Sequence, residues 1–214
     1  MCHIPTKTSY PSPDGRSGTP VHIRLLQPLP VPDFAWQVVC LDFIEGLPKS
    51  NHCNCILVVV DKFSKYNHFI LLTHPFTAIQ VAVQFMDHVF KLHGMPQAMI
   101  SDRDKIFTNA LWQELFEMSG TELRMSTSYH PQTDGQIERV NQCLEAYLRC
   151  FVHTCPTQWK QWLSLAEFWY NNSIHSATGK SPFLVLYGYE PKHFGISAGD
   201  SVATHDLSEW LHER

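Results

Sequence analysis

The sequence has no apolar run near the roughly 18 residues that a membrane-spanning helix needs, and no apolar stretch near its start that would mark a secretory signal. It also has no cluster of five or more lysines and arginines. Its 16 basic residues are outnumbered by 20 acidic ones, which gives a net charge of −4. Because a stand-alone nucleic-acid-binding domain is usually basic, composition alone lowers the odds of DNA binding. The missing apolar run argues against a membrane partner.

Cysteine pairs with metal-binding spacing are missing too. The chain has seven cysteines, an odd number, and no Cys-x-x-Cys pair. Without a secretory signal, this predicts reduced thiols in a cytosolic or nuclear setting instead of a disulfide framework. The stretch 52–55 (HCNC) has metal-binding residue types, but its alternation in a predicted strand and the lack of a second pair favour buried thiols.

The chain does have enough apolar material for a folded core. Of its 214 residues, 44% are hydrophobic and 12% aromatic, which fits one globular domain. Residues 1–35 contain seven prolines and are expected to be an irregular lead-in with no core of their own. The folded domain is expected to cover residues 36–195.

Hydrophobic patterns predict the order of the elements. Apolar runs predict an antiparallel meander of three strands at Trp36–Ile44, Cys55–Val60 and Tyr66–Thr73. A helix is predicted over Thr77–His93, with an apolar stripe of Ile79, Ala82, Val83, Met86, Val89 and Phe90. Two further strands are predicted at Ala98–Asp102 and Thr121–Ser126, with helices at 109–120, 135–153, 157–171 and 181–187. This order predicts an α/β fold with helices packed around a mixed five-stranded sheet.

Three acidic residues stand out by position. Asp42 interrupts an apolar strand, where an ionised side chain is costly unless it is paired or binds a metal. Asp102 ends a short strand, at a sheet edge where ligands often bind. Glu138 is expected near a helix start, because Thr133 and Gln136 have the spacing of a capping box, and the helix dipole favours an ionised Glu there.

Each acid taken alone also has an ordinary structural explanation, as a paired strand acid, a turn residue or a helix-start acid. Together, carboxylates from two strands and a facing helix could converge on two divalent metal ions. Such a pair activates the attacking oxygen and stabilises the leaving oxygen in phosphoryl transfer. Oxygen ligands suit Mg²⁺ or Mn²⁺, and bound cations would reverse the local field of an acidic chain.

Several long motifs surround these acids. Thirty-five residues separate Asp102 from Glu138. The motifs include, in order, LDFIEGLPKS, VVVDKFSKYNHFI, LHGMPQAMISDRDKIFTNALWQELF, SYHPQTDGQIERVN and AEFWYNNSIHSATGKSPFLVLYGYEP. They resemble the integrase catalytic core of retroviruses and retrotransposons, most closely that of gypsy-type LTR retrotransposon polyproteins of plants. The resemblance covers about residues 25–195 and implies a ribonuclease H-like, three-layer fold.

The resemblance implies that Asp42, Asp102 and Glu138 are the catalytic acids and hold two Mg²⁺ or Mn²⁺ ions. It implies metal-dependent polynucleotidyl transfer, namely 3′-end processing followed by strand transfer. The partners would be the DNA of the element ends and of the target duplex, with a homodimer or higher homo-oligomer as the assembly. The location would be nuclear when functional and cytoplasmic before import. DNA contacts are expected from the family's active-site loop and the helix after it, at Tyr129, His130, Gln132, Gln136, Asn141 and Gln142.

The chain departs from the family pattern at both ends. Only Cys2 and His3 hint at the family's upstream His-His-Cys-Cys domain, so no zinc is expected. Residues 1–35 would then be a remnant linker, and 196–214 the start of a truncated C-terminal region. Two other functions stay open: a catalytically idle domesticated remnant that dimerises or binds partners, and a plain metal-dependent nuclease of the same fold. Lys62 and Lys65, in a predicted turn, are expected to be solvated.

Overall fold

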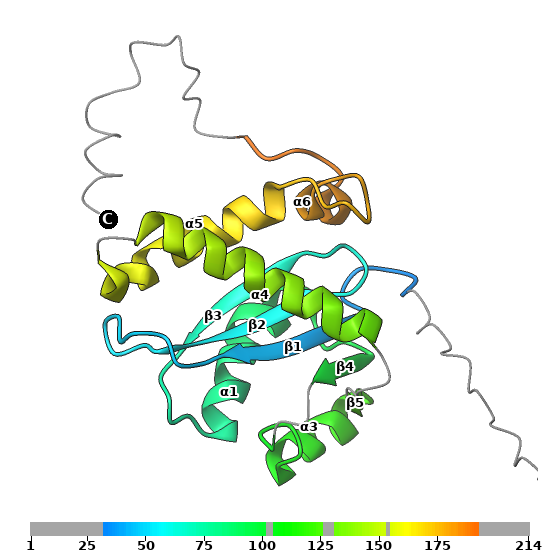
Figure 1. Ribbon diagram of the computed structural model, residues 1–214. Coiled ribbons are helices and arrows are strands. Elements are labelled where there is room, and N and C mark those ends of the chain that lie inside the picture. Colours follow the sequence, from blue (N-terminus) through cyan, green and yellow to red (C-terminus); the bar gives the residue numbers. More distant parts are fainter. Residues whose placement is uncertain (1–31, 102–104, 126–130, 153–154, 193–214) are drawn as a thin grey trace, which may run out of the picture.

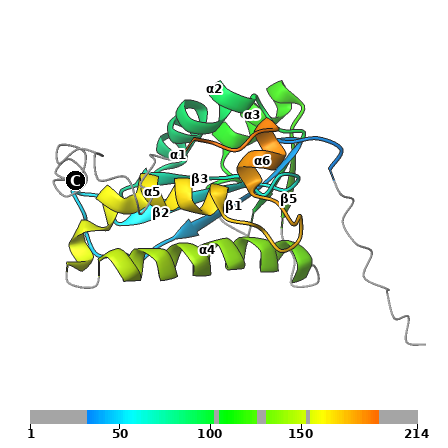
Figure 2. The same ribbon diagram turned by 90° about the horizontal axis from the view of Figure 1, so that it is seen from above.

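The structure, a computed structural model, describes residues 32–101, 105–125, 131–152 and 155–192; the side chains of residues 131–134 lie outside that description. The predicted lead-in and C-terminal segment fall almost wholly outside the described residues, so those domain boundaries stay predictions. The described residues form three layers, with a central sheet between two layers of helices (Figures 1 and 2).

The sheet is the predicted mixed sheet of five strands, in the order β3-β2-β1-β4-β5. Its strands are β1 (Val38–Ile44), β2 (Cys55–Asp61), β3 (Asn67–Leu72), β4 (Ala98–Ser101) and β5 (Glu122–Met125). The first three form an antiparallel meander, and β4 and β5 continue the sheet in parallel with β1. Strand β2 is buried along its whole length because it is central and covered on both faces.

Helices cover both faces of the sheet. One face packs against α1 (Ala78–Phe85) and α3 (Ala110–Ser119), with Phe85, Trp112 and Phe116 in the core. The other face packs against α4 (Pro131–Phe151) and α5 (Trp159–Asn172), through Val140, Leu144 and other side chains. The remaining helical segments are the π-helical turn η1 (Met86–Phe90), α2 (Lys91–His93), the 3₁₀ turn η2 (Pro156–Gln158) and α6 (Pro182–Tyr187).

The helix predicted over Thr77–His93 differs in its buried face. It consists of α1, η1 and α2 in succession, and the π-helical turn changes the helical phase. The side chains that pack on the sheet are those of Ala78, Val81, Ala82, Phe85 and Val89. The predicted stripe was therefore partly wrong, because Ile79, Val83 and Phe90 are exposed. The segment carries apolar residues on two faces, and periodicity alone could not tell which face meets the sheet.

The start of α4 also differs from the prediction. The helix begins at Pro131, four residues before the predicted start at Gly135. Proline is common at a first helical position, because its missing N–H would have no partner there. Thr133 therefore lies inside the helix, and the capping box predicted for Thr133 and Gln136 was wrong. The consequence is that Glu138, the eighth residue of α4, lies about two turns into the helix and not at its start.

The expectations about membrane spans and cysteine thiols can be compared with the described residues. No helix among them is long and apolar enough to cross a membrane. All six cysteines in the described ranges are free thiols, with Cys40 and Cys55 buried.

Candidate active site

The first candidate acid, Asp42, lies on the face of the sheet that α4 covers. Side chains alternate along β1, so Cys40 and Asp42 share a face. Cys40 belongs to the small apolar cluster against which Ile137 of α4 packs, which places α4 over this face of the strand. Asp42 itself is half-buried. Its Oδ1 accepts a hydrogen bond of 2.8 Å from the backbone N–H of Phe43, which orients the carboxylate.

A direct hydrogen bond links Asp42 to α4. The side-chain Nδ2 of Asn141 donates to Asp42 Oδ2 at 2.8 Å. Glu138 lies three residues earlier on the same helix and is exposed. Residues three apart are neighbours on one helix face, so Glu138 lies on the flank of α4 that meets Asp42. The structure thus brings together the elements that carry two of the three candidate acids.

The third candidate acid, Asp102, lies outside the described residues. It follows directly on Ser101, the last residue of β4, and Ser101 pairs with Leu41 of β1. The chain therefore enters residue 102 from a strand that is paired with β1 next to Asp42. Whether the three carboxylates share a site remains a prediction.

The chemistry of this region fits a hard divalent cation. Asp42 and Glu138 offer carboxylate oxygens, which Mg²⁺ and Mn²⁺ prefer. The side-chain Oδ1 of Asn141 is buried and has no hydrogen-bond partner among the described residues. A buried acceptor without a donor is costly, and a metal-bound water beside Asp42 would supply the donor. Within the described ranges, no group of three or more His, Cys, Asp or Glu side chains is placed to hold a metal, but Asp102 is outside them.

Apart from Asn141, whose side chain bonds to Asp42, the predicted DNA contacts divide into three groups. Tyr129 and His130 lie outside the described residues, and so does the side chain of Gln132. Gln142 is exposed on α4, one residue after Asn141. Gln136 is half-buried, and its Oε1 accepts a hydrogen bond of 3.0 Å from Lys65 Nζ.

Sequence reasoning missed the role of the turn between β2 and β3. Lys62 and Lys65 are half-buried, not solvated as expected. The turn is fixed by Asp61, whose side chain is fully buried and accepts hydrogen bonds from three backbone amides and the Ser64 hydroxyl. Aspartate often starts a turn by accepting a hydrogen bond from the backbone N–H two residues later, as Asp61 does from Phe63, and this tendency could have identified the function of Asp61.

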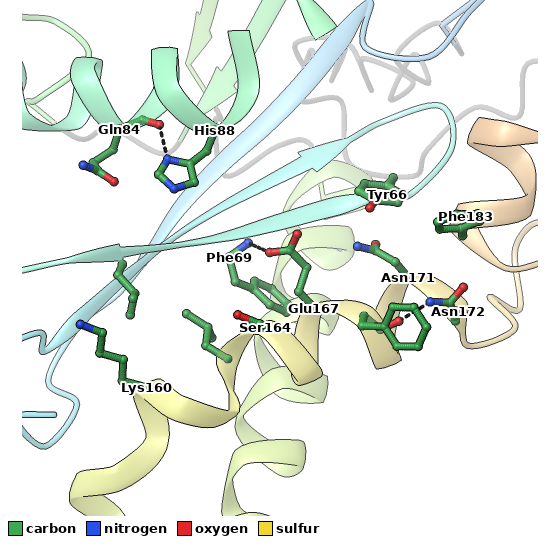
Figure 3. Close-up of a pocket in the computed structure, with 13 residues that line it drawn as sticks. Tyr66, Phe69, Gln84, His88, Lys160, Ser164, Glu167, Asn171, Asn172 and Phe183 are labelled. Atoms are coloured by element: carbon green, nitrogen blue, oxygen red, sulfur yellow. Dashed lines mark hydrogen bonds between the residues drawn. The ribbon is translucent and has the colours of Figure 1, made fainter. Parts of the chain in front are cut away.

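A pocket of about 540 Å³ lies at the β3 edge of the sheet, between the α1–η1 segment and α5 (Figure 3). Two α5 side chains reach the free edge of β3 there. Glu167 accepts a hydrogen bond of 2.8 Å from the N–H of Phe69, and Asn171 accepts one of 2.9 Å from the N–H of Asn67. These bonds satisfy backbone groups of an edge strand. The pocket contains none of the predicted site residues.

Comparison with known proteins places the chain among retrotransposon proteins. No protein-family model matches it. The Tf2-3, Tf2-4 and Tf2-5 transposon polyproteins of Schizosaccharomyces pombe are each 41% identical to it over 166 residues, which is 78% of this chain. The chain spans only about an eighth of these relatives, since the match covers 12% of their length.

Solved structures agree on the fold. The catalytic core domain of HTLV-2 integrase, solved in complex with magnesium, covers 71% of this chain and 96% of its own, with a TM-score of 0.58 and 18% identity. The BIV integrase catalytic core covers 71% of this chain and 93% of its own, with a TM-score of 0.56 and 22% identity. The chain therefore belongs to the retrotransposon polyprotein family that includes the Tf2 elements, and its described part has the fold of a retroviral-type integrase catalytic core.

Proposed function

We propose that this chain is an integrase core that breaks and joins DNA phosphodiester bonds with the help of divalent metal ions. The observation that carries the proposal is the 2.8 Å hydrogen bond between Asn141 and Asp42, which brings the Glu138 flank of α4 to the strand that bears Asp42. The retrotransposon relatives and the integrase-core fold support the same reaction class.

In this proposal Asp42, Asp102 and Glu138 hold two Mg²⁺ or Mn²⁺ ions. When bound, the metal pair lowers the pKa of the attacking oxygen and stabilises the leaving one. The protein fixes the ligands: the Phe43 amide and the Asn141 amide group hold the Asp42 carboxylate in one orientation. Asn141 also keeps one buried acceptor available for a water molecule of the site. The HTLV-2 integrase core was solved in complex with magnesium, which supports a divalent cation.

The proposed nucleophile is water for end processing and a DNA 3′-hydroxyl for strand transfer. Neither step needs a covalent enzyme intermediate, and no described nucleophilic side chain is required. Tyr129, His130, Gln132, Gln136 and Gln142 remain proposed DNA contacts, on the resemblance alone. Asn141, also predicted as a DNA contact, is proposed to orient Asp42 instead.

We also propose self-association and nuclear action. The HTLV-2 core is known in dimeric and trimeric forms, and a simian T-cell lymphotropic virus intasome has the same fold with a TM-score of 0.61 and 17% identity. In this chain large apolar side chains are exposed on α1 and α5, among them Ile79, Val83, Phe168 and Trp169. Exposed apolar side chains that lie together are typical of an interaction surface, and because α1 and α5 cover opposite faces of the sheet, each helix is a separate candidate for one.

The test is a nicking and joining assay with purified protein and Mn²⁺ at low salt. Its substrates are supercoiled plasmid and duplex oligonucleotides that carry the terminal sequence of the element. Joining of terminal oligonucleotides that is lost in Asp42→Asn and Glu138→Gln is the expected result. Nicking without joining would indicate a plain nuclease, and neither activity in a folded protein would indicate an idle remnant.

A further inference from the structure

The second flank of α4 carries a concentration of positive charge that the catalytic proposal does not use. Lys65 Nζ donates to Gln136 Oε1 at 3.0 Å and to the carbonyl oxygen of Lys62 at 2.6 Å. These bonds connect the β2–β3 turn to α4. The Lys65 side chain is therefore held in place, unlike ordinary surface lysines, which move freely in solvent.

The turn that carries the two lysines is fixed by hydrogen bonds. Lys65 has a left-handed backbone, with φ of 68°. Its N–H donates to the carbonyl oxygen of Asp61 at 3.0 Å, and the Asp61 carboxylate fixes the residues between them. A non-glycine residue in this conformation is uncommon and costs free energy, so the surrounding bonds must hold it there.

Further cations lie near this turn. Burial is the main cause that lowers the pKa of His175, and the charges of Lys65 and Arg139 lower it further, so His175 lies within electrostatic range of both. Burial likewise lowers the pKa of Lys65 and of Lys62, and a neighbouring positive charge lowers each further, that of Lys62 for Lys65 and that of Arg124 for Lys62. In Figures 1 and 2 the loop between α5 and α6, which contains His175, lies near the N-terminal half of α4.

Among the described residues these cations form no direct ion pair. Against the effect of burial, which lowers the pKa of Lys65, the charge of the Asp61 carboxylate raises it only in part, and that carboxylate is engaged by hydrogen bonds within the turn. In the part of the chain that the structure describes, no carboxylate lies within 4.0 Å of a charged nitrogen of Lys62, Lys65 or Arg139. Gln136 Nε2 is buried there and has no hydrogen-bond partner among the described residues. Half-buried like charges repel each other unless an anion joins them. Although the chain has a net charge of −4, several cations and the unpaired Gln136 Nε2 donor lie close together here.

We propose that Lys62 and Lys65 of the turn form a subsite for a backbone phosphate of duplex DNA together with Arg139, which lies three residues after Gln136 on the same face of α4. It lies across α4 from Glu138 and Asn141, about 10 Å away by the width of a helix. Phosphate accepts hydrogen bonds from ammonium, guanidinium and amide N–H groups, which are the groups present. The subsite positions the duplex and reads no sequence. The identification of the anion as DNA rests on the proposed function.

The test measures duplex DNA binding as a function of salt for the full chain without metal. Each phosphate contact contributes about 0.9 to the slope of log K against log salt. Lys65→Gln should lower that slope by about 0.9 and weaken binding several-fold at 0.1 M salt, for any DNA sequence. Lys65→Arg should keep the slope, because the positive charge remains. Lys49→Gln is the matched control, since Lys49 is exposed in the β1–β2 loop, at the far end of β2 from the turn.

Several results would overturn the subsite. These are a Lys65→Gln slope equal to that of Lys49→Gln, equal losses in Lys65→Gln and Lys65→Arg, or no salt-dependent duplex binding by the wild type. Lys65-dependent binding of inorganic phosphate with an unchanged DNA slope would assign the site to a free anion instead.

The subsite and the catalytic proposal fail separately. A lower slope in Lys65→Gln, without nicking that depends on Asp42, keeps the subsite and rejects the catalytic proposal. Nicking that depends on Asp42, with an unchanged slope, keeps the catalytic proposal and rejects the subsite.

Discussion

Asp42 and Asp61 are two aspartates on neighbouring strands that differ in burial and in their hydrogen-bond partners. Asp61 is fully buried and accepts four hydrogen bonds from within the protein, three of them from backbone amides. Asp42 is half-buried and is held by the Phe43 amide and by Asn141 of α4. The carboxylate of Asp61 is fully engaged in hydrogen bonds that fix a turn. The carboxylate of Asp42 faces the flank of α4 that carries Glu138. Burial and saturation of hydrogen bonds thus separate a structural acid from a candidate catalytic one.

The largest expected effect is on catalysis. Asp42→Asn should lower the rate of metal-dependent nicking by about 10³-fold or more, because a metal ligand supplies several kcal/mol of transition-state stabilisation. The melting temperature should stay near that of the wild type, because an amide can still accept the Phe43 N–H. Plasmid nicking rates and thermal unfolding measured on the same preparation check both statements. A large loss of stability in Asp42→Asn would remove the contrast with Asp61.

Asp61→Asn should mainly lower the stability of the fold. Loss of charge-assisted hydrogen bonds at a buried site should cost about 2–4 kcal/mol of unfolding free energy. For a chain of this size that corresponds to a fall in melting temperature of roughly 5–15 °C. Urea unfolding followed by circular dichroism measures it, with Asp87→Asn on the exposed side of η1 as the control. A stability equal to that of the control would show that the hydrogen bonds of Asp61 do not stabilise the turn.

Asn141→Leu should have an intermediate effect on activity. It removes the amide that orients Asp42, and groups that orient metal ligands are typically worth about 10- to 100-fold in metal affinity or activity. We expect a raised Mn²⁺ requirement in the nicking assay together with near-normal DNA binding. Arg149→Gln, farther along α4 and exposed, is the control. An unchanged Mn²⁺ requirement in Asn141→Leu would contradict the assigned role.

The smallest expected effect concerns pH and a different part of the molecule. His93 stacks on Trp36 with ring centroids 3.7 Å apart, and its Nε2 lies 3.0 Å from Nε2 of His68, whose Nδ1 contacts Glu167. Burial, and to a smaller extent His68, lowers the pKa of His93 to about 4 from an ordinary 6.5. His93 therefore takes up a proton below about pH 6.5 in the unfolded chain but only below about pH 4 in the folded chain. The free energy of unfolding falls as the pH falls through this window.

Because His93 is half-exposed, the expected loss is on the order of 1–2 kcal/mol. Urea unfolding of the wild type and of His93→Gln at pH 7 and pH 4.5 measures it. The wild type should lose more stability than the variant between these two values. Equal losses would mean that other groups account for the pH dependence.

The sequence predicted the architecture better than the details of the site. The sheet, its mixed pairing and the two helix layers follow from apolar runs and their order, which depend on local pattern. The buried face of residues 77–93 was wrong for Ile79, Val83 and Phe90, because the segment has two apolar faces and only tertiary packing selects one. The start of α4 was wrong because Pro131 was not considered as a first helical residue.

The candidate site follows the same division. Asp42 and Asn141 were both selected from the sequence, and the structure brings them into contact. The bond between Lys65 and Gln136 joins residues 71 positions apart and has no local signal, so the sequence predicted a solvated lysine instead. Long-range side-chain bonds of this kind depend on how the sheet and α4 pack, and no short sequence pattern encodes them.

The most direct test of the account is Mn²⁺ binding, measured by electron paramagnetic resonance on the full chain at neutral pH. The central claim is that Asp42, Asp102 and Glu138 hold divalent metal together. We predict that the wild type binds Mn²⁺ and that Asp42→Asn, Asp102→Asn and Glu138→Gln each lose most of that binding. Glu45→Gln, an exposed acid that follows β1 directly, should bind like the wild type. Wild-type levels of bound Mn²⁺ in Asp42→Asn would contradict the claim.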